Sequence, residues 1–238
     1  MTKVILMRQL VCVLVFLFSV LSFSQNTKKE KIYEFNYLLE YSSTGGECFD
    51  KKCKFFKLIN SNDNTYNLTF YNKGKDSFNL YFKDLYNYFS NAEILKTDFV
   101  KPDTLDFKCG YKNISRNGYA NEIVELDDSY KLNYHKLKDT VINGKEAVKF
   151  APIRKRRLKR GKIDVDDFVV IENNPEFKKI NFNNYFELEQ WNKSKLDFEG
   201  LLVFRKIKVT NRNLKNFKLK LVNTVKFKKV LKLTVDCE

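Results

Sequence analysis

Apolar and polar residues alternate along most of the chain, which is the pattern of half-buried β-strands. In the segment 33–41 every second residue is aromatic or aliphatic, and most of the residues between them are polar. Further strands are expected at 54–59, 66–70, 78–82, 105–109, 122–126, 130–137 and 162–171. The pair Asn143-Gly144, between 140–142 and 147–150, predicts a hairpin with a type I′ turn.

The C-terminal forty residues alternate apolar residues with lysine. From residue 217 this alternation predicts strands with one face in the core and the other in water. Two segments depart from period two. Helical spacing of Leu85, Tyr88, Phe89, Ala92 and Leu95 predicts a short helix within 84–99, and a second is expected at 185–193. No linker or repeat interrupts the chain, so we predict a single, mainly antiparallel β domain over 25–238.

The first 24 residues have the pattern of a secretory signal peptide. Lys3 and Arg8 precede an apolar stretch, and Ser22 and Ser24 place small residues before a cut at Gln25. The apolar stretch 10–23 is 14 residues long, whereas a membrane-spanning helix needs about 20. We therefore expect cleavage near Ser24–Gln25 and an exported protein, periplasmic or secreted, rather than an uncleaved anchor.

The composition narrows the functional classes. The 238 residues include 44 Lys+Arg against 29 Asp+Glu, a net charge of +15, with 43% hydrophobic residues and only 8 Gly and 3 Pro. Disordered and collagen-like chains are excluded. For an exported basic protein the candidate partners are anionic membranes and glycans rather than nucleic acid. The abundance of Lys, Asn, Phe and Tyr also fits A/T-rich codon usage, which would give the same charge without a function.

Four cysteines remain after the expected cleavage, an even number that suggests disulfides in an exported chain. Three pairings are possible, and we favour Cys48–Cys53 with Cys109–Cys237. A zinc site is the alternative. Neither pair has the Cys-x-x-Cys spacing of a zinc knuckle, so no metal ligand is assigned.

The most unusual local feature is a basic run that follows Pro152. Four arginines fall within seven positions, in a chain that otherwise prefers lysine. Arginine binds phosphate and sulfate with two parallel hydrogen bonds, so the run is a candidate anion site. The alternative is a solvated edge strand kept from pairing with other chains by like charge. The candidate residues are Arg154, Lys155, Arg156, Arg157, Lys159, Arg160 and Lys162.

Catalysis finds little support in the sequence. The single histidine, His135, lies on an expected strand without a signature that links it to a nucleophile. The pairs Asp127-Asp128 and Asp166-Asp167 are adjacent, so on a strand their carboxylates point to opposite faces. No phosphate loop, dinucleotide fingerprint or nucleophile elbow is present. We assign no catalytic residue and no cofactor.

The segment 139–164 resembles exported bacterial lipoprotein-carrier (LolA-like) proteins. The shared features are the strand with its Asn143-Gly144 turn, a second strand ending at Phe150-Ala-Pro152, and Gly161-Lys-Ile-Asp164 as a strand start. This resemblance implies one antiparallel sheet curved into an open half-barrel with helices against it, and an apolar cavity for acyl chains. The basic run and the lysine-rich C-terminal segment depart from that family.

Two functions follow as hypotheses. The first is a non-enzymatic carrier of a lipidated or amphiphilic ligand, with aromatic rows of the early strands lining a cavity; these rows would otherwise be ordinary core. The second is a surface or matrix protein that binds polyanions through the basic run alone. An exported hydrolase, with acids brought together only by the fold, is a weaker third.

Overall fold

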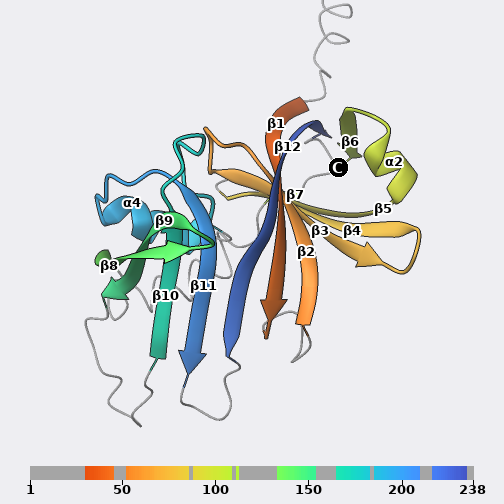
Figure 1. Cartoon of the computed structure of the whole chain (residues 1–238). Coiled ribbons are helices and arrows are strands. Elements are labelled where there is room, and N and C mark those ends of the chain that lie inside the picture. Colours follow the sequence, from red (N-terminus) through yellow and green to blue (C-terminus); the bar gives the residue numbers. More distant parts are fainter. Residues whose placement is uncertain are drawn as a thin grey trace, which may run out of the picture.

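The computed structural model describes residues 30–45, 52–85, 88–108, 111–112, 133–153, 165–182, 185–209 and 216–234. Within these ranges the chain is mainly β, with two short helices and one sheet of twelve strands. Figure 1 shows the sheet, with the strands β1–β5 and β12 in one half and β8–β11 in the other. The predicted fold class, an antiparallel sheet in an open half-barrel, is confirmed.

The strands follow one path in the order β7-β5-β4-β3-β2-β1-β12-β11-β10-β9-β8, and β6 pairs with β12 off this path. Each pair of neighbouring strands along the path is antiparallel, and β6 is parallel to β12. The bounds are β1 Glu30–Thr44, β2 Lys52–Ile59, β3 Tyr66–Lys73, β4 Ser77–Asp84, β5 Tyr88–Leu95, α2 Lys96–Val100, β6 Thr104–Lys108, β7 Tyr111–Lys112, β8 Asn133–Ile142, β9 Lys145–Ile153, β10 Val165–Glu172, α4 Tyr185–Lys193, β11 Leu201–Val209 and β12 Phe217–Thr234.

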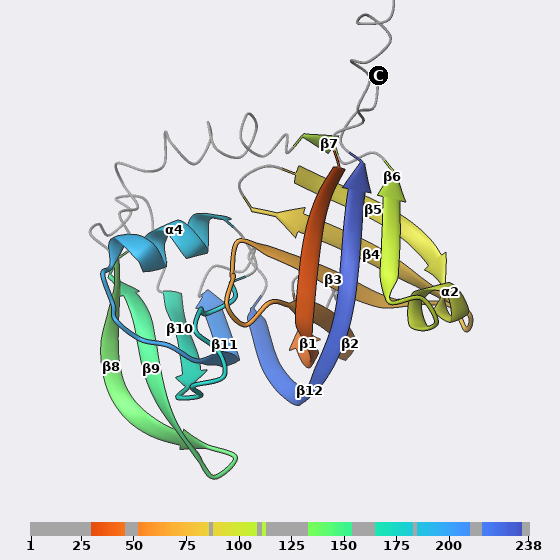
Figure 2. The same cartoon turned by 90° about the horizontal axis from the view of Figure 1, so that it is seen from above.

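The first half of the molecule curves strongly. Seen from above, β3, β4 and β5 run across the direction of β1 and β12, and α2 connects β5 to β6 at the open side (Figure 2). The curvature encloses a core whose fully buried side chains include Phe35, Leu58, Leu68, Phe82 and Leu231. This core holds the aromatic residues that alternation placed on one face of the first strand.

The second half buries its core between the sheet and the chain that follows β10. Residues 173–182 cross the sheet and bury Phe177, Ile180 and Phe182, and α4 adds Leu188 and Trp191. The predicted helix at 185–193 is confirmed with the same bounds. The predicted hairpin turn is confirmed as well, because Asn143 and Gly144 both have positive φ, 51° and 78°, as a type I′ turn requires.

The helix predicted within 84–99 is wrong. Residues 88–95 form β5, which pairs with β4 from Lys83↔Phe89 to Ser77↔Leu95, and only 96–100 are helical. The apolar residues at helical spacing do not share a face: Leu85 belongs to the core of the second half, while Leu95 is 54% exposed. Hydrogen bonding to β4 overrides a local pattern that favoured a helix.

Candidate functional site

Two β-bulges in β12 create the unusual site of this molecule. Val222 is an extra residue between the pairs Tyr41↔Leu221 and Glu40↔Asn223. A second bulge lies opposite Asn36, where Tyr37 pairs with Lys226 and Phe35 pairs with Lys229. Because side chains alternate with period two, each extra residue exchanges the faces on which the following side chains lie.

The first bulge brings Lys226 to the aromatic face of β1, and the second restores the original alternation, which places Lys229 on that face as well. Lys226 lies opposite Tyr37 and Lys229 opposite Phe35, whereas Val225 lies opposite Leu38 and is 46% exposed. The expected division of this segment into an apolar face and a lysine face is therefore wrong between residues 222 and 229. It holds farther along, where Leu231 and Leu233 are buried.

Lys229 is buried, with 2% of its surface exposed. Its Nζ donates to the carbonyl oxygens of Phe99, at 2.9 Å, and Pro102, at 2.6 Å. The rings of Phe99 and Phe227 each lie 5.4 Å from Nζ. Burial lowers the pKa of Lys229, and Asp103 opposes this shift. Lys229 thus fastens the connection from α2 to β6 onto β12.

Lys226 and Tyr37 hold a carboxylate between them. Lys226 Nζ donates to Glu176 Oε1 at 2.6 Å, and the Tyr37 hydroxyl donates to Oε2 at 2.9 Å. The hydrogen bond from Lys226 and then that from Tyr37 lower the pKa of Glu176, and Glu176 raises the pKa of Lys226. Burial, followed by Glu176, raises the pKa of Tyr37. Glu176 comes from the segment that crosses the sheet after β10.

A pocket of about 500 Å³ lies at the second bulge, between β1, β12 and the chain after β2. It combines aromatic and aliphatic side chains with amides and lysines, and Glu34, Asn62 and Lys228 at its edge are exposed. The lining residues are Glu34, Phe35, Asn36, Tyr37, Asn60, Asn62, Lys226, Phe227, Lys228, Lys229 and Val230. Asn36 is fixed there by its side-chain amide, which donates to the Ser61 hydroxyl at 2.9 Å and accepts from the Ser61 backbone N–H.

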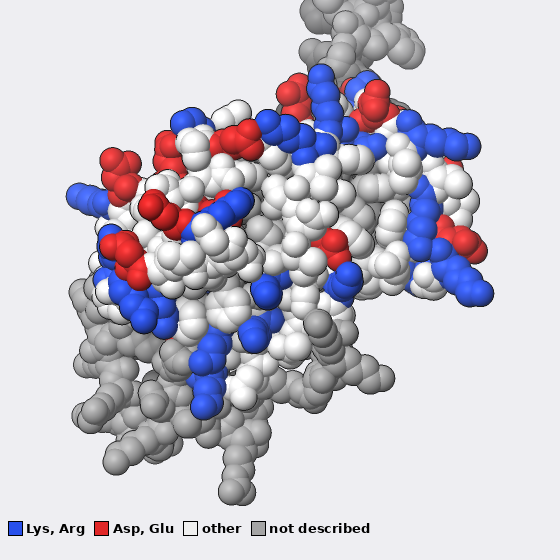
Figure 3. Space-filling view, in the orientation of Figure 1, with Lys and Arg blue, Asp and Glu red and all other residues white. Residues whose placement is uncertain are grey.

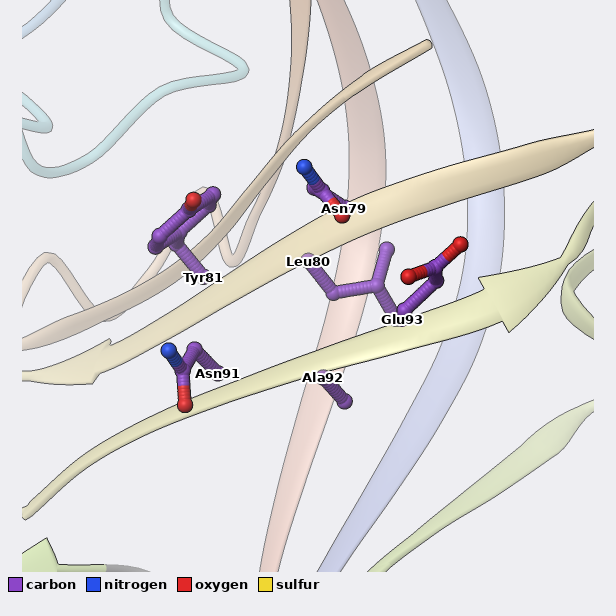
Figure 4. Close-up of a pocket in the computed structure, with 6 residues that line it drawn as sticks. All are labelled: Asn79, Leu80, Tyr81, Asn91, Ala92 and Glu93. Carbon is purple, nitrogen blue, oxygen red and sulfur yellow. The ribbon is translucent and has the colours of Figure 1, made fainter. Parts of the chain in front are cut away.

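A second pocket lies on β4 and β5 and has about half this volume, 250 Å³. Figure 4 shows its lining, in which the polar side chains are Asn79, Tyr81, Asn91 and Glu93. Its lining residues include no lysine or arginine, and its volume falls below the range of about 300–1,000 Å³ usual for ligand sites. The pocket at β12 is therefore the better candidate.

The aromatic rows of the early strands are core in the described structure. Tyr33 contacts Tyr66 and Phe82 at centroid distances of 5.0 and 4.6 Å. Phe177 covers Tyr37 at 4.6 Å. Because the chain's own side chains fill these positions, the described part of the sheet offers a pocket at its bulge in place of the enclosed aromatic cavity that was expected there.

Two further buried charges stabilise the fold away from the pocket. Lys57 on β2 donates to the carbonyl of Phe182 at 3.1 Å, and burial, followed by Lys83, lowers its pKa to about 7. Arg205 on β11 pairs with Glu187 of α4, with side-chain exposures of 10% and 7%. Both interactions tie elements that follow β10 to the sheet.

The basic run Arg154–Lys162 lies outside the described residues, so its role as an anion site stays a prediction. Cys53 is disulfide-bonded. Cys48, Cys109 and Cys237 lie outside the described residues, and the pairing Cys48–Cys53 also stays a prediction. On the face shown in Figure 3, basic and acidic side chains are interspersed over much of the surface.

The candidate titratable residues that the structure describes lie on two different strands, β8 and β10. Among the described residues no group of three or more His, Cys, Asp or Glu side chains is placed to hold a metal ion. His135 lies on β8 opposite Ala151, and Asp166 and Asp167 are consecutive on β10. Asp127 and Asp128 lie outside the described residues. Within the described ranges, no helix has the length and apolar character that a membrane span needs.

Comparison with known proteins gives a distant similarity to a solved structure. No family model matches the chain, and no curated protein matches it. A crystal structure of a domain from Vibrio parahaemolyticus, assigned provisionally to outer membrane lipoprotein sorting, aligns with 84% of this chain and 86% of its own. The identity is 12% and the TM-score 0.25. At that score the similarity adds no argument about fold or ligand, which rest on the residues described above.

Proposed function

We propose that the protein is a non-enzymatic binding protein that holds an amphiphilic ligand in the pocket between β1 and β12. The observation that carries this proposal is the bulge of β12 at Val222, which places Lys226 on the aromatic face of β1, where Lys229 also lies. A regular strand would have kept Lys226 on the opposite face. Bulges are common where a sheet must re-aim side chains near a site.

The pocket suits a ligand with an apolar part and a polar head. Phe227 and Val230, which are only partly buried, offer apolar surface, and lysines lie beside them. Ligand sites are usually mostly apolar with a few polar groups that fix orientation, and 500 Å³ falls within their size range. The ligand would lie partly in this pocket, because the interior of the sheet is packed.

The setting of this activity follows from the predicted signal peptide. An exported protein meets lipids and other amphiphiles in the periplasm or outside the cell, where a carrier or chaperone for a lipidated ligand would work. The polyanion hypothesis depends on the basic run 154–162. It is compatible with the pocket, because a basic loop would bring a carrier to an anionic membrane.

The test is binding of defined amphiphiles to the chain without its first 24 residues. We expect native mass spectrometry and calorimetry to detect binding of oleate or lysophosphatidylglycerol, and Lys226→Ala/Lys228→Ala to weaken it. The control is Lys220→Ala/Lys232→Ala, which removes two exposed lysines of the same strand outside the pocket. Equal binding by both double variants would place the ligand elsewhere, and no binding by the parent chain would remove the proposal.

A further inference from the structure

The carboxylate of Glu176 is bound by two residues of the pocket lining, as the head group of a ligand would be. Its two oxygens are bound separately, one by the ammonium of Lys226 at 2.6 Å and the other by the hydroxyl of Tyr37 at 2.9 Å. Both donors line the pocket. Tyr37 is 6% exposed and is held in place by Phe177, so its hydroxyl keeps a fixed direction.

The donor set matches one chemical class of head group. A monocarboxylate has two oxygens and one negative charge, and the site provides two donors and one cation for them. A phosphate monoester would bring nearly two charges and three oxygens. Of the two other lysines that line the pocket, the buried Lys229 directs its Nζ to the carbonyls of Phe99 and Pro102 and adds no donor at this position.

Building on the proposed function, we propose that the amphiphile is a carboxylate, of the fatty-acid class, and that Glu176 is an internal competitor for its head group. In the unliganded chain Glu176 takes the donors of Lys226 and Tyr37. A bound fatty acid places its carboxylate between the same donors and its chain against Phe227 and Val230, the partly buried apolar residues of the lining, and Glu176 moves into solvent. Half of the Glu176 side chain is already exposed, at 50%, so this movement requires no change in the core.

The experiment compares Glu176→Gln with the parent chain in calorimetric titrations of oleate, octadecyl phosphate and oleyl alcohol. Loss of the competing charge should tighten oleate binding about two- to fivefold, the factor expected for freeing an exposed ion pair. The control is Glu199→Gln, which breaks the Lys178–Glu199 pair of similar exposure, 54% and 51%, outside the pocket. It should leave oleate affinity unchanged.

A second variant tests whether the Tyr37 hydroxyl binds the head group of the ligand. In the Glu176→Gln background, Tyr37→Phe should reduce the preference for oleate over oleyl alcohol, because one of two head-group donors is lost. Oleate affinities that are the same for Glu176→Gln and the parent would overturn the competitor role, while the proposed function stood. Tighter binding of octadecyl phosphate than of oleate would overturn the carboxylate class. Failure of all three compounds to bind would instead remove the proposed function.

Discussion

Replacement of Lys229 by methionine tests how the bulge and the α2–β6 connection depend on one buried ammonium. Methionine fills nearly the same volume but leaves the carbonyls of Phe99 and Pro102 without their donor. A hydrogen bond to a charged group contributes about 1.5–3 kcal/mol. The variant also avoids the desolvation that lowers the pKa of Lys229, which offsets part of the loss. We expect a net destabilisation of about 2 kcal/mol.

The measurement is urea unfolding, with a thermal scan beside it. A loss of about 2 kcal/mol corresponds to a decrease in Tm of roughly 4–8 °C for a domain of this size. Hydrogen exchange should accelerate first in 96–108, the segment that Lys229 fastens. Lys232→Met is the matched control, because Lys232 is an exposed lysine three positions farther along β12. If both variants unfold at the same urea concentration, the argument for a structural ammonium fails.

Three further predictions concern the remaining charges. Lys57 has a pKa of about 7 in the folded chain against 10.5 in the unfolded chain. Between these two pH values the folded state binds fewer protons than the unfolded state, so the parent should gain stability relative to Lys57→Met as the pH rises from about 7 toward 10. A stability difference that is constant over pH 6–10 in urea unfolding would contradict this. Arg205→Met should lower the free energy of unfolding by about 3–5 kcal/mol because it leaves Glu187 buried without the guanidinium, and Arg205→Met/Glu187→Leu should recover most of that loss. A double variant less stable than the single one would refute the pairing argument. Replacement of four arginines of the basic run by serine should weaken co-sedimentation of the protein with phosphatidylglycerol vesicles and reduce the salt dependence of that binding. The four positions are Arg154, Arg156, Arg157 and Arg160. Unchanged binding would exclude the run as an anion site.

Alternation was sufficient to predict the strands that have one buried face. The aromatic residues of 33–41 and the Asn143-Gly144 turn define β1 and the β8–β9 hairpin, because both signals are local. β5 was missed because its inward side chains are the small or partly buried Ser90, Ala92 and Ile94. Such a strand has a weak period of its own and depends on its partner β4 for its conformation.

The candidate site could not be predicted from the sequence for a different reason. Alternation in 217–234 carries no mark of where an extra residue interrupts pairing, so Lys226 was expected on the solvent face of a regular strand. Glu176 is 139 positions from the Tyr37 hydroxyl that it accepts from. Only the register of β12 against β1, and the path of 173–182 across the sheet, bring these groups together.

The pairing of β1 with β12 also determines when the chain can fold. The first described strand finds one of its two neighbours only in residues 218–234, so its hydrogen bonds along that edge must wait until nearly the whole polypeptide is available. Contacts of such large sequence separation form slowly. A chain that ends before β12 lacks the strand that joins both halves and should not unfold cooperatively.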